Sequence, residues 1–148
     1  MSKRTQFLAD LRDSINDAKG NAEDVVKLAS LNLFKKVVNK TPVDTGHLAY
    51  NWNLQLNSPN LTVRSGTDPE KGKTIAEGGK HIESFKLGIK QIWITNNVEY
   101  AYDIEYGKSR VKAPQGMVRV SLQEWDSVYK GAAMTVNQGA GSKQNRYR

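Results

Sequence analysis

Apolar residues recur at steps of three and four over the first forty positions, with charged residues between them. This spacing places the apolar side chains on one face of an α-helix. The pattern predicts a first helix over 2–19 that ends at Gly20, and a second that begins with Asn21 as its N-cap. The second helix ends near Thr41, because Pro42 disfavours the helical conformation in the residue before it. The apolar positions are Phe7, Leu8, Leu11, Ile15, Ala18, Val25, Val26, Ala29, Leu33, Phe34, Val37 and Val38.

The middle of the chain changes to an alternating pattern. Trp52, Leu54 and Leu56 alternate with polar residues, and after the turn signal at 58–60 the alternation resumes with Leu61 and Val63. This pattern predicts a β-hairpin with one buried face. The following segment is rich in glycine and mixed charge, which predicts a mobile loop near 67–88. A further strand is expected over about 90–95, with an irregularity near Gly88.

The last third contains one ambiguous segment and one clear helix. In 98–107, apolar and aromatic residues occupy even positions, which favours a strand whose tyrosines pack in the core or across strands, with a helical turn as the alternative. A helix is predicted from Pro114 to Val136, and a disordered basic tail over 137–148. The fold class expected is α+β in a single domain over 1–136: an antiparallel sheet of about four strands packed against N-terminal and C-terminal helices.

Composition excludes several kinds of chemistry. The 148 residues include no cysteine, which removes disulfides, thiolate metal sites and cysteine nucleophiles. The two histidines, His47 and His81, have no metal-ligand spacing, so no metal and no other cofactor is expected. No apolar run is long enough to span a membrane and no signal peptide is visible, so we expect a protein of the cytoplasm without a membrane partner.

The net charge of +7 is unevenly distributed. Residues 106–123 contain four basic side chains and no acidic one, and the last nineteen residues are also basic. Such clusters favour partners that carry phosphates or carboxylates, although a solvated loop and tail would have the same composition. The four basic residues are Lys108, Arg110, Lys112 and Arg119.

The tripeptide Asp44-Thr45-Gly46 matches the catalytic tripeptide of aspartic proteases, which a chain of this length would have to complete by dimerising. In proteases of the retroviral type the tripeptide follows an apolar strand, whereas here it follows a predicted helix and Pro42. The alternative is a turn in which the Asp44 side chain accepts hydrogen bonds from nearby amides and Gly46 supplies an unusual backbone conformation. We favour the turn.

Three segments in order carry a resemblance to a known family. They are P-V-D-T-G-x-L at 42–48, N-x-x-Y-A-x-x-x-E-x-G at 97–107 and P-Q-x-M at 114–117. The chain resembles the tail-completion or neck proteins of long-tailed bacteriophages, a family of head-tail joining and tail terminator-like proteins. The matching positions are Pro42, Val43, Asp44, Thr45, Gly46, Leu48, Asn97, Tyr100, Ala101, Glu105, Gly107, Pro114, Gln115 and Met117.

The resemblance implies a structural role without catalysis. Subunits of that family assemble as a six-fold homo-oligomeric ring between portal and tail tube, in contact with neighbouring connector and tail-tube proteins, through which DNA passes. It implies a location at the head-tail junction of the virion and in the host cytoplasm during assembly. The basic cluster of Lys108, Arg110, Lys112 and Arg119 would then face either passing DNA or an adjacent ring. A small basic DNA-binding protein is the alternative of a different class.

Overall fold

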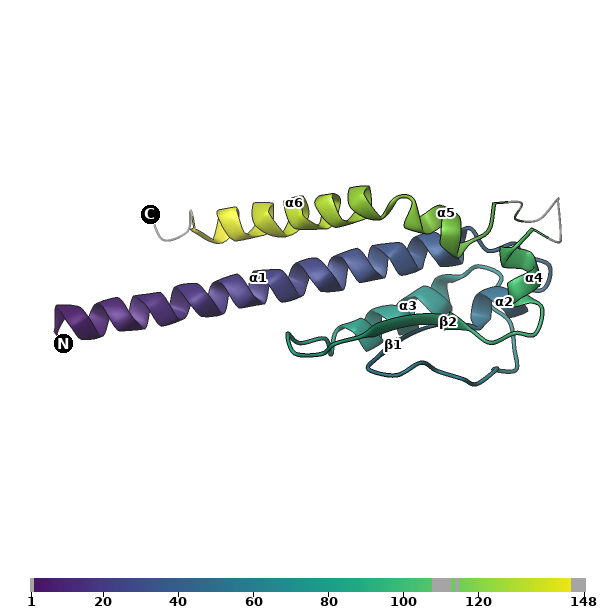
Figure 1. Cartoon of the computed structure of the whole chain (residues 1–148), viewed down its shortest axis with the longest axis horizontal. Coiled ribbons are helices and arrows are strands. Elements are labelled where there is room, and N and C mark those ends of the chain that lie inside the picture. The colour runs from purple at the N-terminus through teal and green to yellow at the C-terminus, as the bar shows by residue number, and fades with distance from the viewer. Residues whose placement is uncertain (1, 108–112, 114, 145–148) are drawn as a thin grey trace.

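The longest element is a single helix that forms the spine of the molecule (Figure 1). The structure is a computed structural model that describes residues 2–107, 113 and 115–144. Helix α1 spans Lys3–Asn39, and Ser2 caps it by accepting a hydrogen bond from the Thr5 N–H at 3.2 Å. The predicted break at Gly20 with Asn21 as a new cap is therefore wrong. A single glycine destabilises a helix by only about 1 kcal/mol relative to alanine. The good helix formers on both sides of Gly20 are sufficient to continue the helix past it.

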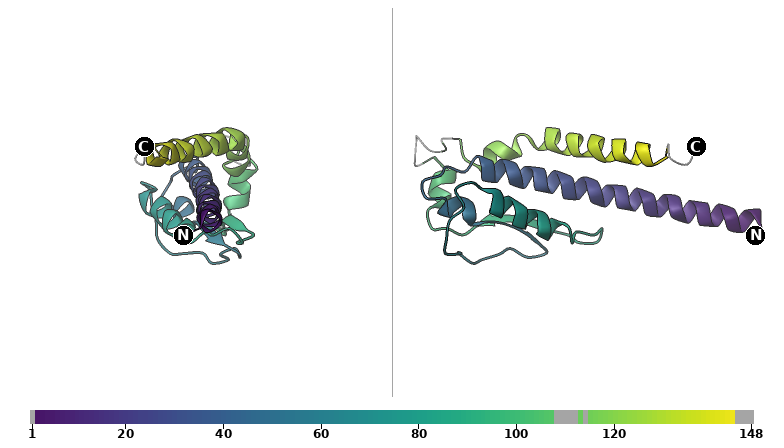
Figure 2. Two further views of the ribbon diagram at one scale, coloured as in Figure 1. Left: turned by 90° about the vertical axis from the view of Figure 1, so that its left-hand side faces the viewer. Right: turned by 180° about the vertical axis from the view of Figure 1, so that it is seen from behind.

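The C-terminal half of α1 lies between two layers (Figures 1 and 2). On one side are α5 (Val118–Leu122) and α6 (Trp125–Gln144), and on the other α3 (Gly72–Ile82) and the sheet. The single helix predicted from Pro114 to Val136 is thus divided into two near Gln123. The predicted disordered tail is helical as far as Gln144, while 145–148 and Pro114 lie outside the described residues.

The sheet has two strands among the described residues, β1 (Trp52–Leu56) and β2 (Ile92–Asn96). They are antiparallel, with Leu54 opposite Ile94. The predicted α+β fold with about four strands is wrong, because 58% of the chain is helical and the sheet is this one pair. The predicted hairpin partner, Leu61 and Val63, forms no strand and both side chains are exposed. Distant β2 pairs with β1 instead, because its apolar residues cover the same core.

Helix α3 lies within the predicted mobile loop, so that prediction is wrong over Gly72–Ile82. The Asp68 carboxylate holds the first turn by accepting hydrogen bonds from the N–H and hydroxyl of Thr74, both at 2.8 Å. A Cβ atom on Gly78 would lie 2.4 Å from the Phe34 ring, so this glycine allows α3 to pack closely on α1. One of the glycines that predicted a loop therefore allows two helices to pack closely.

Two short helices lie at one end of the molecule, α2 (His47–Tyr50) and α4 (Ala101–Glu105). Helix α4 replaces the strand favoured for 98–107, and the alternative, a helical turn, is what forms. The tyrosines of this segment lie exposed to solvent. Their predicted packing in the core or across strands is therefore also wrong.

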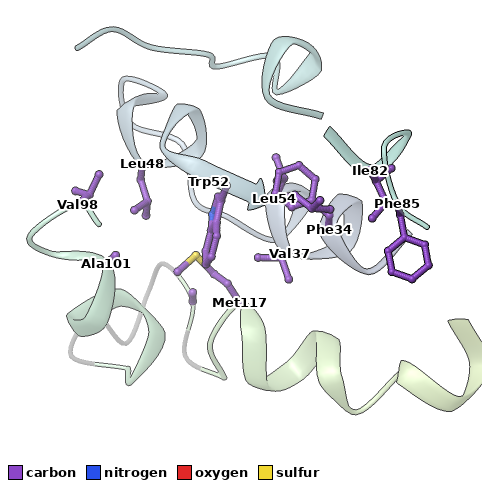
Figure 3. Close-up of a cluster of buried hydrophobic side chains, with 12 residues drawn as sticks. Phe34, Val37, Leu48, Trp52, Leu54, Ile82, Phe85, Val98, Ala101 and Met117 are labelled. Carbon is purple, nitrogen blue, oxygen red and sulfur yellow. The ribbon is translucent and has the colours of Figure 1, made fainter. Parts of the chain in front are cut away.

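The core lies where α1, the sheet and the start of α5 meet (Figure 3). The Trp52 indole N–H donates to the Thr41 hydroxyl at 2.7 Å, and that hydroxyl donates to the Val37 carbonyl oxygen at 2.9 Å. This buried chain ties β1 to the end of α1. A second cluster joins α1 to α6 through Val25, Ala29, Val128 and Ala132. Within the described ranges, none of the helices combines the length and apolar character that a membrane span requires.

Candidate functional site

The segment 41–46 forms the turn between α1 and α2. Gly46 has a φ of +92°, and the His47 N–H donates to the Thr45 hydroxyl at 3.3 Å. The Asp44 side chain is exposed and makes no hydrogen bond within the part of the chain that the structure describes. Asp44 therefore lies in a turn, as predicted, but the predicted hydrogen bonds of its side chain are absent there and Thr45 supplies one instead.

Gly46 is also a point of close backbone contact. A Cβ atom at this position would lie 2.5 Å from the Pro69 nitrogen. The Gly46 carbonyl oxygen accepts hydrogen bonds from the N–H groups of Asp68 and Tyr50, both at 3.0 Å. Gly46 thus joins the turn to the segment that leads into α3, and both its φ and its surroundings exclude a larger residue.

The turn and α4 enclose a cavity of about 320 Å³. Its volume is at the lower end of the range for ligand pockets. Side chains from the first two segments of the resemblance line it together, although more than fifty positions separate them in the chain. The lining residues are Pro42, Asp44, Thr45, Gly46, His47, Leu48, Tyr100 and Ile104.

Glu105 connects the second segment to the third. Its Oε2 atom accepts hydrogen bonds from the backbone N–H groups of Met117 at 2.6 Å and Val118 at 2.9 Å. Its Oε1 atom accepts from the Arg119 backbone N–H at 2.9 Å and from Nε of the same residue at 3.2 Å. The carboxylate therefore caps α5 from another helix, satisfying amides that have no partner inside α5.

These contacts perturb the ionisation of Glu105. Burial opposes the charged form and would raise the pKa of this carboxyl, but the hydrogen bonds from Arg119, Val118 and Met117 outweigh it and hold the pKa below its ordinary value. The Glu105 carboxylate can lie this close to the start of α5 only because residue 116 is glycine. Gly116 has a φ of +86°, and an added Cβ atom would lie 2.5 Å from Oε1 of Glu105. Gly107, just after α4, also has a positive φ of 73°.

Only one member of the predicted basic cluster lies among the described residues. Lys108, Arg110 and Lys112 lie outside them, as does Pro114. The guanidinium of Arg119 pairs with Glu105, also donates to the Glu105 carbonyl oxygen, and lies 4.7 Å from the centre of the Tyr106 ring. The charge of Arg119 is therefore balanced locally.

The surface of α4 and its flanks is aromatic. Tyr100, Tyr102 and Tyr106 are each more than two-fifths exposed, and the rings of the last two lie 4.5 Å apart. Exposed tyrosines of this kind are enriched in protein interfaces, where a rigid ring supplies area at low entropic cost.

The histidines make structural hydrogen bonds. Nδ1 of His47 lies 2.9 Å from the Gly66 carbonyl oxygen, and Nδ1 of His81 lies 2.8 Å from that of Leu54. Across the residues that the structure describes, no three His, Asp or Glu side chains gather as a metal site would require.

Sequence reasoning missed several residues that hold this end together. Asn51 is fully buried, donates to the His47 and Arg64 carbonyl oxygens, and accepts from the Arg64 N–H at 2.7 Å. Lys71 donates to the carbonyl oxygens of Asn39 and Thr41, both at 2.8 Å, and burial lowers its pKa. The spacing of Asp68 and Thr74 carried no standard capping signature, and no sequence signal marked Asn51 or Lys71 for these contacts.

Comparison of the chain with protein-family models, with curated proteins and with solved structures found no match.

Proposed function

We propose that this chain is a structural subunit of the neck of a long-tailed bacteriophage, forming part of a ring between portal and tail tube. The observation that carries the proposal is the joining of three sequence segments at one end of the molecule. Pro42, Asp44 and Tyr100 line one cavity, and Glu105 caps the helix that follows the third segment. The first two segments, which are far apart in the sequence, thus build one surface in space, and Glu105 ties the third segment to it.

That surface has the character of a docking site for another protein. The cavity has apolar walls from Pro42, Leu48 and Ile104, with the exposed Asp44 carboxylate beside them. A basic side chain of a neighbouring subunit would place its aliphatic stem against the walls and its charged head near Asp44. The role requires no catalytic step and no cofactor.

The frame around the cavity is held by backbone contacts. Gly46 packs on Pro69, and Glu105 ties α4 to α5. A docking surface built on such contacts binds with little loss of conformational entropy. Repeated around a closed symmetry axis, the same heterologous contact generates a ring. DNA would pass through the centre, where phosphate contacts without base reading permit sliding.

Immunogold labelling of purified virus particles, with an antibody to the folded protein, tests the proposal. Particles come from a lysate that expresses the chain, and an antibody to the major capsid protein serves as the control for position. Gold confined to the head-tail junction is the expected result. Absence of the chain from blots of disrupted particles would reject the proposal. Titration of free duplex DNA at increasing salt would then test the DNA-binding alternative. Comparison of the proteolytic activity of the Asp44→Asn variant with that of the wild type would test the protease alternative.

The cavity is tested by complementation of a virus in which the gene is inactivated. Asp44→Lys places a like charge where a basic side chain is proposed to dock, so we expect loss of head-tail joining with a normally folded protein. The matched control is Glu99→Lys, because Glu99 is also exposed but does not line the cavity. Equal joining by both variants would remove this cavity from the proposal.

A further inference from the structure

The cavity between the turn and α4 is chemically suited to an arginine side chain. Among the described residues, those that line it include one carboxylate, Asp44, and no Lys or Arg. The Asp44 side chain is exposed and has no hydrogen-bond partner in that part of the chain. Tyr100, which is also exposed, lines the same cavity. A guanidinium pairs with a carboxylate through two parallel hydrogen bonds and stacks on aromatic rings, so this combination favours arginine over lysine.

Two arginines lie close together in the last residues of the sequence. From 127 to 148 the chain carries four basic side chains and no acidic one, and two of the four are Arg146 and Arg148. We define residues 145–148 as the C-terminal segment, which lies outside the described residues. Its charge is opposite in sign to that of Asp44, so the two attract each other.

The C-terminal segment cannot reach the cavity of its own chain. Helix α6 runs back along α1, so Gln144 lies at the end of the molecule opposite α2 and α4 (Figures 1 and 2). The 20 residues of α6 span about 30 Å. Arg148 is four positions beyond Gln144, which places it at most about 14 Å from that residue. A C-terminal segment that fills this cavity must therefore come from another molecule.

We infer that the C-terminal segment of one copy docks in the cavity of the next copy, with one of its arginines paired to Asp44. The inference rests on the proposed function and names the partner that the cavity takes in the ring. The contact joins two different surfaces, so it is heterologous and repeats from copy to copy until the ring closes. Because these surfaces lie at opposite ends of the molecule, the copies lie end to end with overlapping ends, and α1 is directed around the ring.

The same arrangement covers two exposed apolar surfaces. The N-terminal part of α1 extends past the end of α6, so a neighbour that receives the C-terminal segment lies beside it (Figures 1 and 2). The end of that neighbour which contains α4 exposes Tyr102 and Tyr106. Exposed apolar surface of this kind marks an interaction site. The exposed large apolar residues in this part of α1 are Phe7, Leu8, Leu11 and Ile15.

The contact is small. One arginine in a cavity of about 320 Å³ binds weakly on its own. In a ring each copy both gives and receives a C-terminal segment, and the other contacts raise the effective concentration of the two partners. The free protein is therefore expected to associate through this contact only at high concentration.

Disulfide trapping between two single-cysteine proteins tests the inference, because the chain has no cysteine of its own. Tyr147→Cys places a thiol in the C-terminal segment, and Thr45→Cys places one at an exposed position that lines the cavity. The matched control is Tyr102→Cys, which is exposed at the same end of the molecule but outside the cavity. Circular dichroism checks that each protein retains its helix content. We expect Tyr147→Cys to form more mixed dimer with Thr45→Cys than with Tyr102→Cys, and added salt to reduce it.

Charge reversal identifies the contact. Asp44→Lys in the Thr45→Cys protein should abolish the mixed dimer, because two positive charges then meet. Arg146→Glu and Arg148→Glu together in the Tyr147→Cys protein should restore it, because carboxylates then face the new lysine. A folding defect caused by Asp44→Lys would not be repaired by changes in another molecule.

Four results would each overturn the inference: equal trapping at Thr45→Cys and Tyr102→Cys, no mixed dimer at the highest concentration, trapping unaffected by Asp44→Lys, or no restoration by the reversed C-terminal segment. Failure of trapping together with gold at the head-tail junction rejects this inference and retains the proposed function, and the cavity then takes a different neck protein. Trapping without the chain in virus particles retains the contact between copies and rejects the role in the neck.

Discussion

The carboxylate of Glu105 accepts a hydrogen bond from the Met117 backbone N–H at 2.6 Å, so the last residue of α4 caps the start of α5. Two further backbone N–H groups, of Val118 and Arg119, point at the same carboxylate. This contact joins the two ends of the segment that contains Lys108, Arg110 and Lys112 of the predicted basic cluster. It also places the Arg119 charge beside the carboxylate and not toward a ligand.

Replacement of Glu105 by Ala should lower the free energy of unfolding by about 2–3 kcal/mol, because three buried or half-buried N–H groups lose a charged acceptor. Urea denaturation monitored by circular dichroism measures the change. The matched control is Glu99→Ala, which removes an exposed carboxylate nearby and should change stability by about 0.5 kcal/mol or less. Equal effects of the two substitutions would show that the cap contributes nothing.

Stability should fall in acid through the same carboxyl. Since the hydrogen bonds hold the folded-state pKa of Glu105 below its ordinary value, the unfolded chain binds more protons in this range, and stability rises with pH. The contribution is fully present above the unfolded pKa of about 4.3 and is lost as the pH falls through the folded pKa. Urea midpoints between pH 6 and pH 3 should therefore decline less for Glu105→Gln than for the wild type. Parallel declines would contradict the assignment.

Gly78→Ala should destabilise the protein by about 1–3 kcal/mol, because the added methyl group meets the Phe34 ring and forces α3 away from α1. Thermal unfolding reports the loss. Gly72→Ala is the control on the same helix, since its Cβ would meet nothing within 4 Å. That substitution should be neutral or slightly stabilising, because alanine favours helix over glycine by about 1 kcal/mol.

The two ends of the Asp44-Thr45-Gly46 tripeptide should respond differently to substitution. Gly46→Ala puts a side chain at a positive φ and against the Pro69 backbone, so we expect a loss of at least about 2 kcal/mol or failure to fold. Asp44→Asn should change stability by about 0.5 kcal/mol or less, since the carboxylate is exposed. Both are measured by denaturant unfolding at neutral pH. A large loss for Asp44→Asn would show that its side chain supports the turn.

The sequence by itself determined the local patterns. Pro42 ended the first helical region at the right place, and the alternation around Leu54 and Ile94 predicted two strands that form. The amphipathic C-terminal region was also predicted as helix. These features depend on periodicity and on the backbone limits of proline, which act between neighbours in the chain.

Only the tertiary structure decided which segments pair and what each glycine does. Gly20 was interpreted as the end of a helix, yet it lies inside α1. Gly78 was interpreted as part of a loop, yet it lies in α3 and leaves room for the Phe34 ring of α1. The tyrosines near Glu105 fit a strand by period, but their segment forms α4 and adds no strand to the sheet among the described residues. The capping of α5 by Glu105 spans twelve or more positions. Such contacts arise from packing in three dimensions, and no local periodicity encodes them.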